Sequence, residues 1–595
     1  MAEASAPSAT EALDPIALEV IWSRLIAVVN EQAAALVRTS FTPSVAEAGD
    51  LSACVFDARG HLLAHAVTGT PGHINSMEMC MKHLVRIFPP ATLQPGDVLI
   101  TNDPWIASGH LHDLSIVTPA FHADGRVVGF FGNVCHVADI GGLPFSADGR
   151  SRYEEGLFIP PLKLYKAGRP NEEVFAFVRA NVRSPDEVVS ELQSMTAAND
   201  VGVARLLESM AEFGLTSLEA VASAIIGRTE AATRAAIRAL PDGVYRNQVT
   251  CDGYDAPITL AVTITIDGDG MRVDYAGTSP ESPRGINVVL NYTRAYTTYA
   301  LTCLLTPEIP NNEGAFRPVQ VVAPAGCILN CRPPAPVSAR HVLGHFLPGL
   351  IFGALAPVVP ERMMAEGSAN LWNVQLHGYW RDGTPFNLLW FNAGGTGARP
   401  ALDGLSSTAF PSGVSGTAVE IIEQRAPVVV RRRQLRVDSG GPGRQRGGLG
   451  HWLVLQGAPR TDRPYTLSPF FDRTAHPARG LAGGRPGAPG RFCLRYPDGR
   501  EETPLPKQTV TIDPAAEVWI GLPGGGGYGD PLTRDPALVL ADVRAGLVSP
   551  AAALADYGVA VARDPACPDG DPAGWVIAGL RRGGDAPPNS LRGYA

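Results

Sequence analysis

The hydrophobic pattern at the start of the chain predicts one long amphipathic helix. Apolar residues recur at helical spacing through residues 16–29. Asp14 followed by Pro15 is typical of a helix start, because the side chain caps the first turn and proline suits it. We therefore expect a helix from Pro15 to about Thr39, preceded by a disordered leader over 1–14.

Beyond residue 50 the pattern changes to alternation. Residues 52–57 and 61–65 predict two strands joined by a turn, and 260–266 and 271–275 predict a second hairpin around Asp267-Gly-Asp-Gly270. Further strands are expected at 97–101, 114–118 and 126–135. Helices are expected at 76–87, 187–197, 201–213, 292–305 and 345–356, with a final helical pair within 535–558.

These elements predict an α+β fold in a large, multi-lobed chain. With 595 residues the chain is too long for one core, and 64 Gly and 52 Pro favour many turns and short strands. We expect an N-terminal α/β region that carries the chemistry, followed by β-rich lobes. The expected segments after the leader are 15–240, a central α+β region at 241–424, a Gly/Pro-rich β lobe at 425–530, a helical segment at 531–570 and a flexible tail at 571–595.

Composition excludes several classes of protein. The net charge is −9 and the basic run Arg431–Arg433 follows three valines, as at a strand end, so nucleic-acid binding is not expected. The sequence contains no run of 18 apolar residues, so no membrane span is expected. The N-terminus lacks the basic and apolar regions of a signal peptide. The nine cysteines are dispersed without CxxC spacing, which favours reduced thiols and a cytoplasmic protein.

The histidines point to a metal site. Eight of the 13 fall between His61 and His136. Among them are two polar groups that flank strand-like segments, Asn102-Asp103-Pro104 with His110-Leu-His-Asp113, and His136-Val-Ala-Asp139. Imidazole nitrogens and carboxylate oxygens suit Zn, Mn or Fe(II). Several of these histidines, such as His61, His65, His83 and His122, are expected to be ordinary surface or hydrogen-bonded residues.

The segment 522–531 contains GxGxxG at Gly524, Gly526 and Gly529, but Asp530-Pro531 prevents the helix that a dinucleotide site requires. A conformationally special turn is the expectation there. The sequence also lacks a GxxxxGK[ST] phosphate loop and a GxSxG elbow.

Several motifs in one order resemble the hydantoinase B / 5-oxoprolinase family, which is related to the acetone carboxylase α-subunit. Asn102-Asp-Pro104 with His110-x-x-Asp113 resembles the family's NDP…THxPD, and His136–Gly142 resembles its HHADIGG. The likeness extends over about 15–560. It includes Glu47–Ser52, His73, Asn287–Leu305 with Asn312–Gly314 and Phe316–Pro318, Gly394–Pro400 with Asp403-Gly404, Asp438–Gly441 with Arg446–Gly448, and Gly524–Pro531.

The resemblance implies a site and a division of labour. It implies Asp50, His110, Asp113 and His136 as ligands of a divalent metal, with Asp103, Asp139 and His73 as catalytic or supporting residues. It also implies a partner, a hydantoinase A-type ATPase with an actin-like fold, that binds ATP and Mg and phosphorylates the amide oxygen of a small cyclic amide. The present chain would complete ring opening with metal-activated water in a hetero-oligomer.

Departures from the family pattern concern the substrate. His112 stands where the family usually has proline, Val137 replaces a second histidine, and Ala48 and Gly49 replace two basic residues. Three functions therefore stay open: a hydrolase of hydantoin, 5-oxoproline or a lactam; a subunit of an ATP-dependent acetone or ketone carboxylase; and a non-catalytic docking subunit for the ATPase. The polar His/Asp set disfavours the last of these.

Overall fold

The computed structural model describes residues 14–369, 371–459, 461–568 and 570–580. Apart from Asp14, the expected leader lies outside these residues. The chain divides into two compact units. Unit 1 comprises Met1–Arg246, Ala261–Pro348 and Ser412–Ala418, and unit 2 comprises Asn247–Leu260, Gly349–Pro411 and Val419–Ala595. The central region expected at 241–424 is thus divided between the two.

Unit 1 is built on a seven-stranded sheet with the order β2-β1-β5-β4-β3-β6-β7, in which neighbouring strands are antiparallel. The chain order differs from the spatial order, because β5 lies between β1 and β4. The strands are β1 (Leu51–Asp57), β2 (Leu62–His65), β3 (Val98–Thr101), β4 (Asp113–Phe121), β5 (Val127–His136), β6 (Leu162–Lys166) and β7 (Arg169–Pro170).

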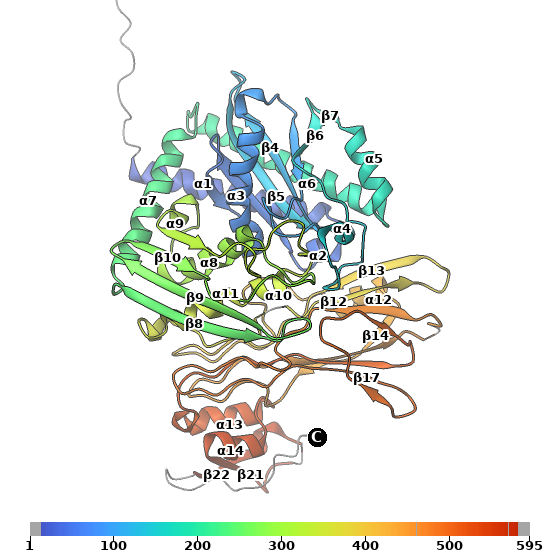
Figure 1. Cartoon of the computed structure of the whole chain (residues 1–595). Helices are drawn as coiled ribbons and strands as arrows, with labels where there is room; N and C mark the ends of the chain where they lie inside the picture. Colours follow the sequence, from blue (N-terminus) through green and yellow to red (C-terminus); the bar gives the residue numbers. More distant parts are fainter. Residues whose placement is uncertain (1–13, 370, 460, 569, 581–595) are drawn as a thin grey trace, which may run out of the picture. The chain divides into compact units, whose positions relative to one another are not determined.

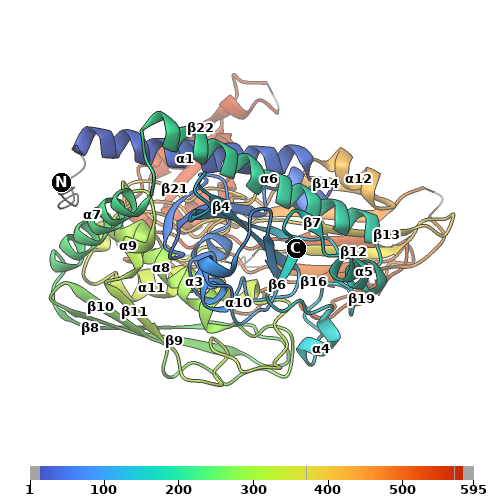
Figure 2. The ribbon, with the colours of Figure 1, turned by 90° about the horizontal axis from the view of Figure 1, so that it is seen from above.

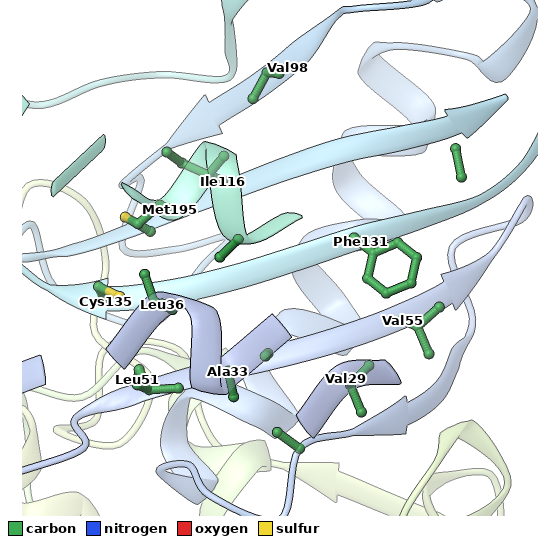
Figure 3. Close-up of a cluster of buried hydrophobic side chains, with 14 of the residues drawn as sticks. Val29, Ala33, Leu36, Leu51, Val55, Val98, Ile116, Phe131, Cys135 and Met195 are labelled. Carbon is green, nitrogen blue, oxygen red and sulfur yellow. The ribbon is translucent and has the colours of Figure 1, made fainter. Parts of the chain in front are cut away.

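Helices α1 (Pro15–Thr39) and α6 (Pro185–Glu212) cover one face of this sheet, and Figure 2 shows them side by side above β4. Asp14 caps α1 as expected, accepting a hydrogen bond from the Ala17 amide at 3.3 Å. The buried side chains of α1 and α6 meet those of β1, β4 and β5 in a continuous apolar layer. Figure 3 shows Val29, Leu36, Val55, Phe131 and Met195 in that layer.

By length and composition α1 is apolar enough to cross a membrane, and it is the one such helix among the described residues. Its apolar residues Leu25, Val29 and Leu36 are nonetheless packed against the sheet. A helix whose apolar side chains pack on a sheet in this way has the position of a core helix.

The two helices expected at 187–197 and 201–213 form the single 28-residue helix α6. Asn199 and Gly202 lie at or near the expected break, and both contribute to the packing of the continuous helix. Asn199 is fully buried and accepts a hydrogen bond from Gln32 at 2.7 Å, and its amide donates to the Ile116 carbonyl at 3.2 Å. A Cβ on Gly202 would lie 2.4 Å from Phe131, so glycine lets the helix approach β5.

Helix α3 (Pro71–Ile87) covers the opposite face and packs Met77 and Met81 against Phe56 and Phe130. The expected start at residue 76 was five residues late. The other elements with residues in unit 1 are α2 (Pro43–Ala46), η1 (Pro90–Thr92), α4 (Arg152–Glu155), α5 (Glu172–Asn181), α7 (Glu219–Arg238), β8 (Gly243–Cys251), β9 (Ile258–Asp267), β10 (Gly270–Asp274), α8 (Leu290–Leu305), α9 (Glu313–Phe316), β11 (Val319–Val322), α10 (His341–Gly344) and α11 (Leu347–Leu355).

Two antiparallel sheets form the core of unit 2, with the orders β13-β12-β16-β19 and β14-β15-β20-β17-β18. Their inner faces share one apolar cluster that includes Trp372, Trp390, Leu453 and Ile520. The elements are η2 (Pro360–Arg362), β12 (Val374–Tyr379), β13 (Pro385–Trp390), α12 (Val419–Arg425), β14 (Val428–Leu435), β15 (His451–Gly457), β16 (Tyr465–Pro469), β17 (Arg491–Arg495), β18 (Glu501–Glu502), β19 (Val510–Ile512) and β20 (Glu517–Gly521).

In the glycine-rich segment after β20, Gly524–Gly527 do not form the conformationally special turn that the sequence predicted, whereas Gly529 does have a left-handed φ of +74°. The amides of Gly524, Gly525, Gly526 and Gly527 donate to the carbonyls of Ala488, Gly448, Glu366 and Arg485 at 2.8–3.1 Å. The first and fourth partners lie on one segment, so the neighbours repeat every three residues, as in a polyproline-II-like helix. A Cβ on Gly525 would lie 1.9 Å from the Thr396 carbonyl oxygen. Close backbone packing, and not a left-handed φ, requires glycine here.

The chain continues with η3 (Pro531–Thr533) and the expected helical pair, α13 (Pro536–Arg544) and α14 (Pro550–Tyr557). A flexible tail was expected from residue 571. Instead, η4 (Pro572–Gly574) is followed by β22 (Trp575–Leu580), which pairs with β21 (Val559–Arg563). The aromatic and β-branched residues Trp575, Val576 and Ile577 favour a strand; 581–595 lie outside the described residues. Figure 1 shows the mixed helices and sheets, and the α+β prediction is confirmed.

Candidate metal centre

Three strand ends of the unit 1 sheet place polar side chains together. Asp113 is the first residue of β4 and lies directly opposite His136, the last residue of β5. Leu51, the first residue of β1, lies opposite Cys135. Because neighbouring antiparallel strands start and end at the same edge, Asp50 also reaches this edge.

The loop before β4 adds His110 and His112. Asn102 holds this loop, because its amide donates to the Leu111 carbonyl at 2.8 Å and its oxygen accepts from the Ile159 amide at 2.7 Å. Gly109 has φ +90°, which a side chain would disfavour. The sequence motif NDP thus positions the histidine loop through its asparagine.

Asp113 lies at the centre of the group. Its Oδ1 is 2.6 Å from His110 Nε2 and 3.1 Å from His136 Nδ1. All three residues are buried, and one ligand atom from each lies within 4.8 Å of the others. Burial opposes ionisation of Asp113, but the neighbouring His73 and Arg340 outweigh it and hold the pKa of Asp113 well below its usual range. The carboxylate is therefore ionised.

The tautomer of His110 is fixed. Its Nδ1 lies 2.8 Å from the Ser338 carbonyl oxygen, which only accepts, so Nδ1 carries the proton and donates it. Burial, followed by the charge of Arg340, lowers the pKa of His110 to about 3, so the ring is neutral. The lone pair of Nε2 is then directed into the group. This is the arrangement by which a protein prepares an imidazole for a metal.

These residues fit a divalent cation. His110 Nε2 is buried and has no hydrogen bond, although Asp113 Oδ1 is only 2.6 Å away. Two unprotonated acceptor atoms this close in a buried site repel each other, and a cation bound by both would relieve that repulsion. Two imidazoles and one carboxylate are a donor set for Zn, Mn or Fe. The structure thus brings His110, Asp113 and His136 together.

His73 and Asp50 extend the group. His73, in the first turn of α3, places Nε2 2.8 Å from Asp113 Oδ2. Burial lowers the pKa of His73, but Asp113 more than compensates and the net shift is upward. Asp50 Oδ1 lies 3.9 Å from His73 Nδ1 and accepts a hydrogen bond from Thr70 Oγ1 at 2.9 Å. Asp50 therefore adjoins the three clustered residues through His73, and its role as a ligand stays a prediction.

Asp103 and Asp139 have partners of their own. Asp103 accepts a hydrogen bond from the Trp105 amide at 3.0 Å, and burial raises its pKa. Asp139 forms an ion pair with Arg183 at 2.6 Å and accepts a hydrogen bond from the Gly141 amide at 3.2 Å. These contacts give Asp139 a part in shaping the loop after β5. Catalytic roles for Asp103 and Asp139 stay predictions.

Sequence reasoning missed Arg340 and Phe145. Arg340 is 4% exposed, forms an ion pair with Asp113 Oδ2, and lies with its guanidinium 4.2 Å from the Tyr292 ring centroid. The available signal was Arg340-His341 followed by His345, polar residues within an otherwise apolar stretch.

Phe145 gives the histidine group an aromatic wall. Its ring centroid lies 4.7 Å from that of His112, 5.0 Å from His136 and 5.8 Å from His110. Burial and the neighbouring histidines lower the pKa of His112 well below its usual range. His112, noted in the sequence only as a departure from the family pattern, is thus a neutral ring stacked on His136.

The fold and the site define a mixed α+β chain with a buried His–Asp–His group at one edge of an antiparallel sheet. The Hydantoinase B/oxoprolinase family model matches residues 14–531. The chain belongs to this family.

Two relatives match the chain over most of its length. It is 30% identical to the B-type component of a putative D-/L-hydantoinase of Pseudomonas sp. (strain NS671), over 92% of this chain and 95% of that protein. It is 31% identical to the caprolactamase beta subunit of Pseudomonas jessenii, over 92% and 96%.

Two solved structures share the fold. The structure of the ATP-dependent caprolactamase from Pseudomonas jessenii matches with a TM-score of 0.84 at 28% identity, covering 94% of this chain and 99% of that one. An acetone carboxylase structure matches with a TM-score of 0.84 at 22% identity, covering 95% and 81%. The latter likeness shows the fold alone.

Proposed function

We propose that this chain is the metal-binding B-type component of an ATP-dependent enzyme that opens a cyclic amide: a hydantoin, 5-oxoproline or a lactam. The observation that carries the proposal is the buried group of His110, Asp113 and His136, in which His110 Nε2 has no hydrogen bond. The hydantoinase and caprolactamase relatives support the substrate class.

The chemistry requires activation from outside this site. An unstrained amide carbonyl is a poor electrophile, so the γ-phosphoryl group of ATP is transferred to the amide oxygen and ADP leaves. One water then adds at that carbon, the carbon–nitrogen bond breaks and the nitrogen takes a proton. A second water hydrolyses the resulting acyl phosphate, releasing phosphate and the open-chain carboxylate. His110, Asp113 and His136 would hold a divalent cation, which when bound would lower the pKa of a water molecule toward neutral pH.

A partner holds the nucleotide. The hydantoinase and caprolactamase relatives are each named as one component of an enzyme, which supports a second component. The sequence has no GxxxxGK[ST] phosphate loop. We assign ATP and Mg²⁺ to a hydantoinase A-type ATPase in a cytoplasmic hetero-oligomer. Within this chain, Asp50 is the proposed fourth ligand, and His73, Asp103 and Asp139 support the site or contact substrate.

The test is reconstitution. The chain, loaded with Zn²⁺ or Mn²⁺, is mixed with its A-type partner, ATP and Mg²⁺, and screened against 5-oxoproline, hydantoins and lactams. We expect substrate-dependent ADP release and ring-opened product in equal amounts, with neither from this chain alone. His110→Ala abolishes ring opening, whereas His122→Ala, at the far end of the β4–β5 hairpin, does not.

The same mixture distinguishes the alternatives. Turnover that depends on acetone and bicarbonate identifies a ketone carboxylase, which the acetone carboxylase fold makes the second candidate. Ring opening by this chain without ATP would refute the division of labour. Full activity of His110→Ala identifies a docking component without a catalytic metal.

A further inference from the structure

The two oxygens of Asp113 have different neighbours. Oδ1 lies 2.6 Å from His110 Nε2 and 3.1 Å from His136 Nδ1. Oδ2 lies 2.8 Å from His73 Nε2 and forms an ion pair with Arg340 Nη2. The carboxylate is thus divided: Oδ1 faces the two imidazoles of the candidate metal centre, and Oδ2 is held by two donors outside that group.

Arg340 has little freedom to leave this position. Its Nε donates to the Ser108 carbonyl at 2.6 Å, and the side chain is 4% exposed. Its guanidinium lies 4.2 Å from the Tyr292 ring centroid, where a cation is attracted to the ring face. A Cβ on Gly109 would lie 2.9 Å from Arg340 Cδ, so the missing side chain at 109 leaves room for the arginine.

Tyr292 is itself enclosed by glycines on two helices. A Cβ on Gly72 of α3 would lie 2.6 Å from the Tyr292 ring, and a Cβ on Gly344 of α10 would lie 2.5 Å from it. The ring therefore cannot shift without moving backbone. It gives Arg340 a rigid support, and a charge-assisted ion pair in such a site is strong and directional.

We propose that Arg340 is a positioning residue that holds Asp113 Oδ2, so that Asp113 offers the single oxygen Oδ1 to the cation. This inference rests on the metal site of the proposed function. Arg340 also offsets the negative charge of Asp113, which leaves more of the cation's charge available to polarise water. Residues outside the ligand set commonly tune metal sites in this way.

The test measures metal binding, not turnover. Metal-free wild-type protein, Arg340→Gln and Arg340→Lys are titrated with Zn²⁺ against a chromophoric chelator and with Mn²⁺ by electron paramagnetic resonance. Arg534→Lys is the matched control, because Arg534 is equally buried and pairs with Asp403 and Asp542 in unit 2.

We expect Arg340→Gln to bind metal about 10–100-fold more weakly, the usual effect of losing a residue that orients a ligand. X-ray absorption should then show a changed number of carboxylate oxygens on the metal. Lysine keeps the charge but has no planar fork, so Arg340→Lys should restore only part of the affinity. Arg534→Lys should match wild type.

Three results would overturn the inference. The first is a folded Arg340→Gln variant that keeps wild-type affinity and ligand number. If Arg340→Gln fails to fold, Arg340→Lys decides: binding equal to that of Arg534→Lys excludes the positioning role. Absence of Zn²⁺ and Mn²⁺ binding by the wild-type chain removes the metal site, and the proposed function with it. If the wild-type chain binds metal and the Arg340 variants bind it equally well, only the positioning role of Arg340 is excluded and the proposed function stands.

Discussion

Asp113 and His136 face each other across the first rung of the β4–β5 ladder, with 3.1 Å between Asp113 Oδ1 and His136 Nδ1. This pairing needs no loop closure beyond the hairpin itself, because register places the two side chains on one face of the sheet. The candidate metal centre is thus anchored to the central strands of unit 1.

The first prediction concerns metal retention. His136→Ala and His110→Ala each remove one nitrogen ligand, and we expect the Zn²⁺ affinity to fall at least about 100-fold. Equilibrium dialysis with elemental analysis measures the loss. His122→Ala is the matched control, since His122 follows β4 at the opposite end of the strand and pairs with Asp124. Equal metal content in all three variants would contradict the assignment.

The second prediction concerns stability without metal. Asp113→Asn leaves the buried charge of Arg340 without its carboxylate, which typically costs about 3–5 kcal/mol. Hydrogen–deuterium exchange of peptides from β4 and β5 in the metal-free protein should show this loss, with peptides of β15 in unit 2 unchanged. Asp186→Asn, which breaks the exposed pair with Arg179, should change protection by less than about 1 kcal/mol. Similar exchange in both variants would exclude a buried ion pair at the site.

The candidate site could be located from the sequence, because eight of the 13 histidines lie between His61 and His136 and the motifs around His110, Asp113 and His136 resemble those of the family. His110, Asp113 and His136 fall within one stretch of the chain, and their motifs flank segments that do form β4 and β5. Arg340 could not be found in this way. It lies 227 residues beyond Asp113 in sequence, and no periodicity relates the two.

In the fold, too, elements set by local pattern could be predicted and contacts between distant segments could not. Periodicity predicted α1, the β1–β2 hairpin and the β9–β10 hairpin, which depend on local pattern. It could not predict that β5 lies between β1 and β4. Nor could it show why Gly524–Gly527 are glycines, since the reason is the distant backbone segments that approach them.

The third prediction tests that glycine packing. A Cβ on Gly525 would lie 1.9 Å from the Thr396 oxygen and 2.3 Å from its carbonyl carbon, and backbone cannot yield as a side chain can. We expect Gly525→Ala to destabilise unit 2 by about 3 kcal/mol or more. Gly579→Ala, whose Cβ would have its nearest neighbour at 3.9 Å, should be neutral or stabilise by about 0.5–1 kcal/mol. Hydrogen–deuterium exchange of β15 and β20 peptides compares the two variants. Equal protection in Gly525→Ala and Gly579→Ala would refute the packing argument.

The fourth prediction is a pH dependence of stability from Glu155. Its Oε1 accepts hydrogen bonds from the Val337 and Ser338 amides at 2.8 Å each, and Oε2 is buried without a partner. Burial raises the pKa of Glu155 from 4.5 to about 8. The folded chain therefore binds a proton that the unfolded chain releases between these values. The stabilising contribution of protonated Glu155 is complete below pH 4.5 and is lost as the pH rises through about 8.

Glu155→Gln removes this titration while keeping an oxygen for the two amides, so its stability relative to wild type should increase steadily from about pH 5 to about pH 8. Glu154→Gln is the matched control, because Glu154 is the preceding residue of α4 and pairs at the surface with Arg150. Hydrogen–deuterium exchange of peptides covering 337–345, measured at about pH 5 and about pH 8, reports the change in stability next to Glu155. Parallel pH profiles for wild type and Glu155→Gln would show that the buried carboxyl does not titrate in this range. Because the Ser338 carbonyl also accepts a hydrogen bond from His110 Nδ1, Glu155→Gln should hold the His110 tautomer more firmly than wild type does at the upper end of this range.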